Sequence, residues 1–196
     1  MSSLLRSFVL CVLLVLAACS NADKPAFQAT DITGADFGRD FSLTDQNGKR
    51  RALQDFRGQV VVMFFGYTHC PDVCPTTLAE LAGAVRKLGK SAEKVQVLLV
   101  TVDPDRDTPE IMGKYVSAFN PTFLALRGDA DETSRVAKEF KVIYQKVAGP
   151  RPETYTMDHS AGSYVFDPQG RLRLYVSYGR GADVFAHDID LLLKSP

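Results

Sequence analysis

The stretch QVVVMFF at positions 59–65 constrains the fold more than any other feature of the chain. A run of this length, rich in β-branched and aromatic residues, is typical of a strand that is buried on both faces. A second apolar run follows at 95–102. Between the two runs, apolar residues recur at helical spacing from Leu78 to Leu88, and Pro75 suits the first turn of that helix. Strands buried on both faces require helices on both sides of a sheet, so these runs predict an α/β fold.

The rest of the chain continues this alternation. Periodicity and turn residues predict helices at 108–119, 129–140 and 182–193, short strands at 122–126 and 142–147, and hairpins at 41–53 and 163–177. We therefore predict an α/β domain with a mixed central sheet, helices flanking the sheet and an N-terminal hairpin.

The first 19 residues have the layout of a secretory signal, with Arg6, a short apolar run at 8–16 and small residues before Cys19. As a helix the apolar run would rise only about 15 Å, half the hydrocarbon thickness of a bilayer, so we do not expect it to persist as a membrane span. The tetrad LAAC at 16–19 is similar to the bacterial lipobox, in which the cysteine becomes lipid-bearing. An ordinary cleavage site with a chance cysteine is the alternative.

These features divide the chain into a signal peptide at 1–19, a polar tether at 20–38 and one domain at 39–196. Cleavage would remove Cys11, and lipidation would use Cys19. The two remaining cysteines would then act outside the cytoplasm, where disulfides form and persist.

The charge balance argues against one class of partner. Lys plus Arg and Asp plus Glu both count 23, and no basic stripe or aromatic-interleaved basic run is present. Nucleic-acid binding depends on such positive surfaces, so nucleic acid is not an expected partner.

The chemistry centres on GYTHCPDVCP at 66–75, where Cys70 and Cys74 lie between the predicted strand and helix. If both lie on the first helical turn, a spacing of four places their Cβ atoms about 5–6 Å apart on one face. Two sulfurs so placed can bind one metal ion or form a disulfide, and a helix N-terminus favours the thiolate. An inert structural disulfide is the alternative, although the flanking polar and proline residues suit an exposed turn.

A third ligand would separate metal binding from redox work, and the chain has three histidines. His69 adjoins Cys70, and neighbouring side chains of a turning backbone tend to diverge. His187 falls in the last predicted helix, where a solvated position is expected. His159 lies in a loop before a strand, and sites in open α/β sheets gather at strand ends. A loop histidine paired only with Asp158 is the alternative for His159.

Two thiolates and one imidazole form a soft, three-coordinate set that suits copper, because thiolate selects the cuprous ion and imidazole accepts both oxidation states. Zinc would also bind, although structural zinc usually has four protein ligands. Asp72 or Asp158 could orient the ligands from outside the coordination sphere.

With these residues in view, the sequence resembles the Sco/SenC family of thioredoxin-like, membrane-tethered copper chaperones. Three segments carry the resemblance: GYTHCPDVCP at 66–75, TVDPDRDTPE at 101–110, and DHSA at 158–161 with DPQG at 167–170. It extends from about Phe41 to the C-terminus.

The resemblance implies a thioredoxin-like fold and one copper ion, as Cu(I) or Cu(II), bound by Cys70, Cys74 and His159. It implies delivery of copper to the copper-bearing subunit of cytochrome c oxidase, with another copper chaperone as a further possible partner. It places the domain in the bacterial cell envelope, on the periplasmic or outer side of the cytoplasmic membrane. A family-specific hairpin insertion would lie at 145–157.

Metal delivery is not catalysis in the ordinary sense, but two enzymatic or regulatory alternatives use the same residues. A thiol-disulfide oxidoreductase would cycle Cys70 and Cys74 through a disulfide and would not need His159. In a redox or copper sensor, whether copper occupies the site would matter more than delivery of copper to a recipient. The segment 103–110 has a structural role available as a turn and helix start, with partner docking as its alternative.

Overall fold

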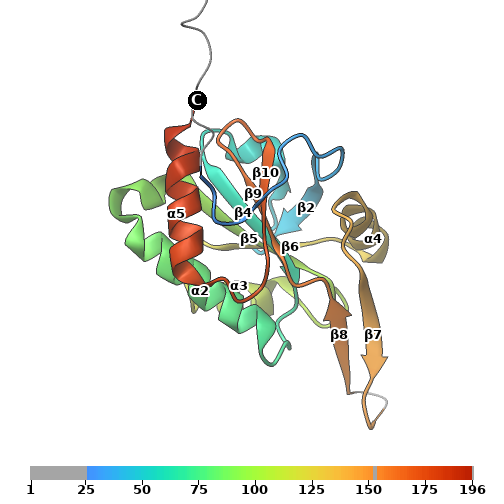
Figure 1. Ribbon diagram of the computed structural model, residues 1–196. Helices are drawn as coiled ribbons and strands as arrows, with labels where there is room; N and C mark the ends of the chain where they lie inside the picture. Colours follow the sequence, from blue (N-terminus) through green and yellow to red (C-terminus); the bar gives the residue numbers. More distant parts are fainter. Residues whose placement is uncertain (1–25, 152–153, 196) are drawn as a thin grey trace, which may run out of the picture.

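The computed structural model describes residues 26–151 and 154–195 (Figure 1). The predicted signal peptide, Cys19 and the first residues of the predicted tether lie outside these ranges. None of the helices in the described ranges has the length and apolar character needed to cross a bilayer.

The central sheet has eight strands in the order β1-β10-β9-β4-β5-β6-β2-β3. Its middle strands β4, β5 and β6 are parallel, and every other neighbouring pair is antiparallel, so the predicted mixed sheet is confirmed. The strands are β1 (Thr30–Asp31), β2 (Ser42–Asp45), β3 (Arg50–Ala52), β4 (Val60–Gly66), β5 (Val95–Thr101), β6 (Leu124–Arg127), β9 (Ser163–Phe166) and β10 (Leu172–Val176).

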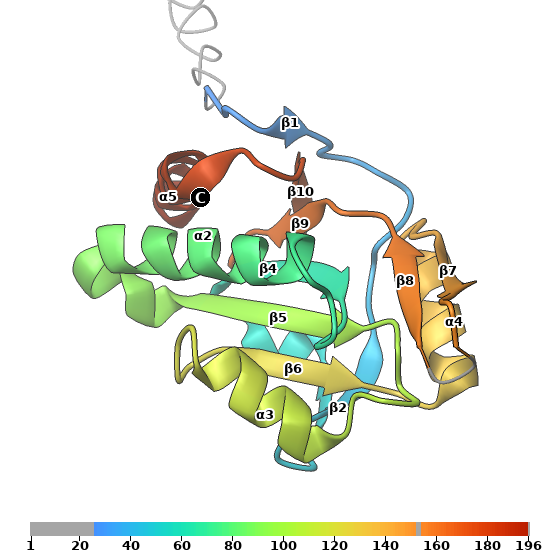
Figure 2. The same cartoon turned by 90° about the horizontal axis from the view of Figure 1, so that it is seen from below.

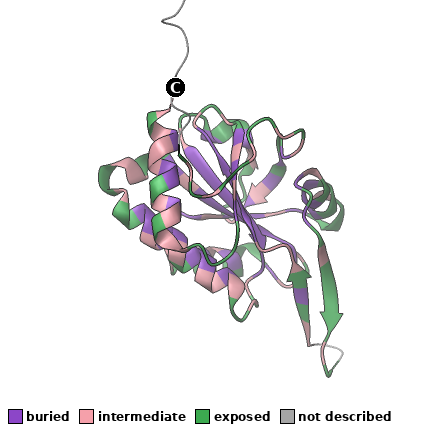
Figure 3. Ribbon diagram, viewed as in Figure 1, coloured by how far each residue is buried: buried purple, intermediate pink, exposed green. Residues whose placement is uncertain are grey.

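Helices cover both faces of this sheet, as the apolar run at 59–65 requires. In Figure 2, α2 (Val73–Lys87) and α5 (Gly181–Lys194) lie together on one side of β4 and β5, and α3 (Pro109–Ser117) lies on the other. The helix α4 (Ala130–Glu139) stands beside the sheet, and the 3₁₀ turns are η1 (Leu53–Phe56) and η2 (Gly89–Lys94). Every residue of β4 is buried, because both of its faces are covered (Figure 3).

The aromatic part of the core holds the sheet to the chain that follows α4. The ring of Phe140 packs against those of Phe65, Tyr164 and Phe166 at centroid distances of 5.4–6.1 Å. The Tyr164 hydroxyl donates to the Phe140 carbonyl at 2.7 Å. These contacts fix the end of α4 and therefore the start of the next segment, which projects from the domain.

That segment is a second, two-stranded antiparallel sheet of β7 (Tyr144–Ala148) and β8 (Tyr155–His159), which projects from the domain in Figure 1. It corresponds to the strand predicted at 142–147 and to the insertion predicted at 145–157. Most of β7 is exposed, whereas Met157 of β8 is buried. The β8 strand is therefore the side of the hairpin that faces the domain.

The N-terminal boundary differs from the prediction. We expected a tether over 20–38, but Thr30 and Asp31 pair with β10, and the backbone N–H groups of Gln28 and Ala29 donate to the buried Asp188 carboxylate of α5. Only two residues of this segment form a strand, which is too short for a periodic signal. Its main partner lies 160 residues away in the sequence and could not be inferred from the segment itself.

Candidate metal centre

The cysteine segment begins where β4 ends, at the carboxyl edge of the parallel strands. Gly66 is the last residue of β4, and a Cβ there would lie 2.7 Å from Cys74 Sγ, so the close approach of sulfur and backbone requires glycine. The α2 helix begins at Val73, so Pro75 lies in its first turn as predicted. Cys74 is therefore in the first turn, whereas Cys70 lies in the preceding loop, so only Cys74 meets the condition that both cysteines lie on the first helical turn.

His159 reaches this loop because of the way β9 pairs. The β9 strand runs antiparallel to β4 with Ser163 opposite Phe64, so β9 starts beside the end of β4. His159 is the last residue of β8, only four positions before Ser163. Between them, Gly162 lets the chain pass against Tyr175, since a Cβ at Gly162 would lie 2.1 Å from the Tyr175 hydroxyl oxygen.

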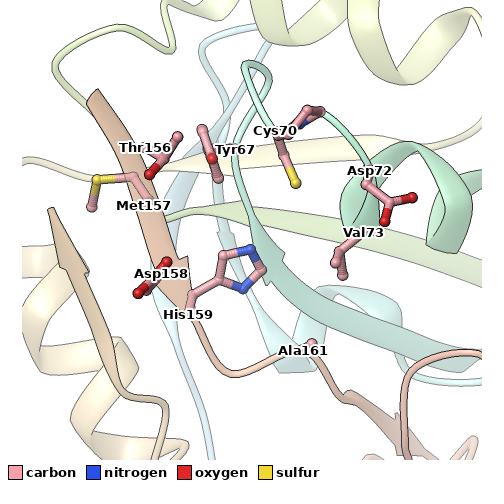
Figure 4. A pocket seen from close by; sticks show the side chains of 10 residues that line it. Tyr67, Cys70, Asp72, Val73, Thr156, Met157, Asp158, His159 and Ala161 are labelled. Carbon is pink, nitrogen blue, oxygen red and sulfur yellow. The ribbon is translucent and has the colours of Figure 1, made fainter. Parts of the chain in front are cut away.

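The three predicted ligand side chains meet. One ligand atom from each of Cys70, Cys74 and His159 lies within 4.8 Å of the other two, and these three form the single His/Cys/Asp/Glu group of this kind in the described ranges. His159 Nε2 is 3.7 Å from Cys74 Sγ. Figure 4 shows the Cys70 side chain and the His159 ring facing each other across an open pocket. The volume of this pocket is about 350 Å³. Bonds of about 2.3 Å to one ion require the sulfurs of a trigonal site to be about 4 Å apart, which these positions approach.

The two thiols are electrostatically unequal. A hydrogen bond from the Cys74 thiol is the main reason that the pKa of Cys70 is well below its usual value, and the Cys74 backbone N–H, 3.4 Å from Cys70 Sγ, adds to the effect. The negative Cys70 sulfur and burial raise the pKa of Cys74. Cys74 is fully buried and Cys70 is half-buried. The reduced pair therefore holds one half-buried thiolate, at Cys70, and one buried thiol, at Cys74.

His159 is oriented by contacts on both sides of its ring. Nδ1 lies 3.0 Å from the Ser160 carbonyl oxygen, which leaves Nε2 to face the sulfurs. The ring packs edge-on against buried Tyr67 at 6.0 Å. Burial acts against the charged imidazole, but the Cys70 sulfur, the Ser160 carbonyl and the Asp158 charge outweigh it and raise the pKa of His159.

The other two histidines lie outside the three-residue group. His187 is on the exposed face of α5, as predicted, with Nδ1 2.7 Å from Asp188. His69 turns away from the sulfurs toward Thr68 and Asp107, with its Nδ1 3.1 Å from the Thr68 hydroxyl. Neither histidine joins the two sulfurs.

The predicted outer residues have different positions. Asp158 contributes its charge to His159, although the direct partner of Nδ1 is the Ser160 carbonyl. Asp72 precedes α2, and its carboxylate accepts a hydrogen bond from Thr76 at 3.4 Å. Both line the pocket, and their proposed orienting roles stay predictions.

Sequence reasoning missed a buried carboxylate behind the cysteine loop. Asp107 is fully buried and accepts hydrogen bonds from the Thr101 hydroxyl at 2.5 Å and from the Thr68 hydroxyl at 2.5 Å and backbone N–H. Burial raises the pKa of Asp107. In the sequence this aspartate, between Arg106 and Thr108, looks like a turn residue. Gly66 and Thr101 pair at the ends of the neighbouring strands β4 and β5, and this pairing brings the loop after β5, which carries Asp107, beside the cysteine loop after β4.

The fold and the site together define a class: a thioredoxin-like α/β domain whose loops bring two cysteines and one histidine to a shared soft-metal site. The SCO1/SenC family matches residues 29–194, and the chain belongs to this family.

Individual relatives agree with this membership. A SCO2-like protein of Rickettsia typhi is 34% identical over 162 residues, which cover 81% of this chain and 80% of the relative. The mitochondrial SCO2 homolog of Bos taurus is 43% identical over 148 residues, which cover 74% of this chain and 55% of the relative. The chain thus matches little more than half the length of the mammalian relatives.

Solved structures show the same fold. ScoI of Bradyrhizobium japonicum, determined with copper bound, is 42% identical with a TM-score of 0.71, and the match covers 80% of this chain and 99% of that one. Apo Sco1 of Thermus thermophilus is 39% identical with a TM-score of 0.77, and covers 87% and 99%.

Proposed function

We propose that this protein binds one copper ion through Cys70, Cys74 and His159 and delivers it to the copper centre of cytochrome c oxidase. The main support is that one ligand atom from each of these three residues lies within 4.8 Å of the other two, although Cys74 and His159 are 85 residues apart in the sequence. Copper in the ScoI structure of Bradyrhizobium japonicum supports the choice of metal. The family of the chain supports the role in oxidase assembly.

The character of the site suits a carrier. Two sulfurs and one imidazole favour the cuprous ion, which accepts low coordination numbers. The pocket is open on the Cys70 side, so an incoming ligand from a recipient can approach the metal while Cys74 still holds it from the buried side. Copper would then leave by stepwise exchange of ligands, with no change in its oxidation state required.

The location is also part of the proposal. The LAAC tetrad at 16–19 supports lipidation at Cys19 and anchoring at the outer, periplasmic side of the cytoplasmic membrane. Oxidase subunits and a second copper chaperone are the partners that this position would serve.

The test is anaerobic loading of the reduced domain with Cu(I), with the dissociation constant measured by competition against a chromophoric Cu(I) chelator. We expect one copper per chain and binding weakened at least about 10- to 100-fold in His159→Ala, because losing a ligand should cost no less than losing an outer residue of a metal site. His187→Ala is the matched control and should bind as the wild type does, since His187 lies on the exposed face of α5. Equal affinity of His159→Ala and wild type would remove His159 from the site.

A thiol-disulfide oxidoreductase is the second candidate, because a half-buried thiolate of low pKa beside a fully buried thiol is the arrangement of a nucleophilic and a resolving cysteine. Cys70 would attack a partner disulfide, and Cys74 would then release the partner as a dithiol while the pair becomes a disulfide. Turnover on an oxidised peptide that persists in His159→Ala without copper would favour this candidate over copper delivery.

A further inference from the structure

The loop after β5 contacts both halves of the proposed copper site. Two of its three carboxylates, Asp103 and Asp107, are 3% and 0% exposed, which is unusual for charged loop residues. Asp107 accepts hydrogen bonds from the Thr68 hydroxyl and backbone N–H of the cysteine loop. Asp103 faces the other way, toward the hairpin that carries His159.

On the hairpin side, three residues form a closed cycle, which we call the latch: Asp103, Arg106 and Tyr155. Arg106 Nε donates to one Asp103 oxygen at 2.5 Å, and the Tyr155 hydroxyl donates to the other at 2.8 Å. Arg106 Nη1 donates to the Tyr155 backbone carbonyl at 3.0 Å. The guanidinium also stacks on the Tyr155 ring, 3.5 Å from its centroid. Such charge-assisted bonds between poorly solvated groups are among the stronger ones in proteins.

The latch acts on the strand that ends at the metal site. Tyr155 is the first residue of β8 and His159 is the last, so a bond to the Tyr155 backbone fixes the direction of the whole strand. Arg106 also lies 5.7 Å from the Tyr67 ring, whose edge contact positions the His159 ring. Outside the latch, the hairpin is a two-stranded sheet separate from the central one, and such a pair has little stability of its own.

We propose that Arg106, held by Asp103, is a positioning residue that fixes the His159 strand over Cys70 and Cys74 and thereby sets how tightly the site retains copper. This inference rests on the proposed function, because it needs His159 as a copper ligand. Without the latch, binding would have to order the hairpin, and the entropy of that ordering would weaken affinity. The metal would then be held mainly by the two sulfurs.

The experiment is a double-mutant cycle between Arg106→Met and His159→Ala, with the Cu(I) dissociation constant measured by chelator competition. We expect Arg106→Met to bind copper about tenfold more weakly than wild type, at the lower end of the effects found for outer residues of metal sites. In the His159→Ala background, Arg106→Met should have almost no further effect on the dissociation constant, because the imidazole that Arg106 positions is absent. Tyr155→Phe, which removes only the hydroxyl bond, should give a smaller loss with the same coupling.

Arg51→Met is the matched control. Arg51 donates to the buried Asp45 at 2.8 Å and lies 5.7 Å from the Phe56 ring, and its side chain is 19% exposed against 22% for Arg106. The Arg51→Met variant therefore loses an ion pair with a buried carboxylate and a ring contact, as Arg106→Met does, but on β3, away from the site. Its copper affinity should equal that of the wild type.

The outcomes separate the two proposals. Wild-type affinity in Arg106→Met and Tyr155→Phe, or an equal loss with and without His159, overturns the latch inference while the copper site stands. Wild-type affinity in His159→Ala overturns the copper ligand set and the latch inference with it. Should Arg106→Met fail to fold, the double-mutant cycle is measured with Tyr155→Phe alone, with the same criterion.

In the metal-free protein, faster amide exchange at Ser160, whose N–H bonds to the Ile143 carbonyl, is the second expected sign of a freed hairpin.

Discussion

At the scale of single residues, the site depends on close approaches that no motif records. Cys74 is placed by its helix, but its sulfur fits only because Gly66 has no side chain. Behind the loop, Asp107 accepts three hydrogen bonds from Thr68 and a fourth from Thr101. The cysteines and His159 could be proposed as ligands from residue type and spacing, whereas these supports require the tertiary structure.

Gly66→Ala tests the close approach. The new Cβ would lie 2.7 Å from Cys74 Sγ and 3.2 Å from Leu99 Cδ1, both in the core, so the sulfur must move. We expect weaker Cu(I) binding and a loss of about 1–3 kcal/mol in the free energy of unfolding, as overpacked cores show. Chelator competition and urea unfolding would measure the two effects.

Gly113→Ala is its control, since a Cβ there meets only the flexible Gln46 side chain at 3.3 Å. Alanine is also the better helix former, and Gly113 lies within α3. This variant should bind copper normally and unfold no more easily than wild type. Unchanged copper affinity in Gly66→Ala would show that the sulfur tolerates displacement.

At the scale of elements, the sequence predictions held where a long periodic signal existed. The buried runs at 59–65 and 95–102 became β4 and β5, and the hairpin predicted at 41–53 formed as β2 and β3. Pro75 lies in the first turn of α2, which begins at Val73, as its residue type predicted. Short β1 had no pattern to detect.

The hairpin of β2 and β3 owes part of its stability to Asp45. Its carboxylate is buried and accepts bonds from Arg51 Nε at 2.8 Å and from the backbone N–H groups of Asn47 and Lys49. Burial alone would raise the pKa of Asp45, but these bonds outweigh it and lower the pKa below 3.8. A carboxyl whose pKa is lower when folded stabilises the protein above its unfolded pKa and loses that contribution as pH falls through the folded pKa.

Asp45→Asn should therefore lower the free energy of unfolding by about 2 kcal/mol near neutral pH, the size expected for lost bonds to a buried charge. The gap between variant and wild type should narrow as pH falls below 3.8, where the wild-type carboxyl becomes protonated. Denaturant unfolding over a pH series would measure it. Asp183→Asn, at an exposed carboxylate paired with Lys87, should show no such gap. A gap that stays constant with pH would contradict the assignment to charge.

At the scale of the whole molecule, the strand order assembles the site. Alternating strands and helices predicted a mixed sheet, but not that β9 would insert beside β4 in the antiparallel sense. That neighbour relation brings His159 to Cys74, which lies 85 residues away in the sequence. Pairing between distant strands depends on the packing of the whole chain, and local sequence does not encode it.

The same scale governs the N-terminal segment, which leads from the predicted anchor into the domain. The Asp188 carboxylate of α5 accepts hydrogen bonds from the backbone N–H groups of Gln28 at 2.9 Å and Ala29 at 2.8 Å. Arg180 Nη2 donates a hydrogen bond to the Gln28 carbonyl at 2.9 Å. With only two paired residues in β1, these bonds supply much of the attachment. Since α5 packs on α2, the helix that carries Cys74, the segment is joined to the site through two helices.

Asp188→Asn keeps the size of the side chain but replaces one acceptor oxygen by a donor, so it should release the segment. We expect faster amide hydrogen exchange at Gln28 and Ala29, with exchange at the Val62 and Phe64 amides of β4 unchanged. Copper affinity should stay at the wild-type value, because no described contact joins residues 26–31 to Cys70, Cys74 or His159. A parallel fall in copper affinity would instead show that the attachment of the N-terminal segment is transmitted through α5 and α2 to the metal site.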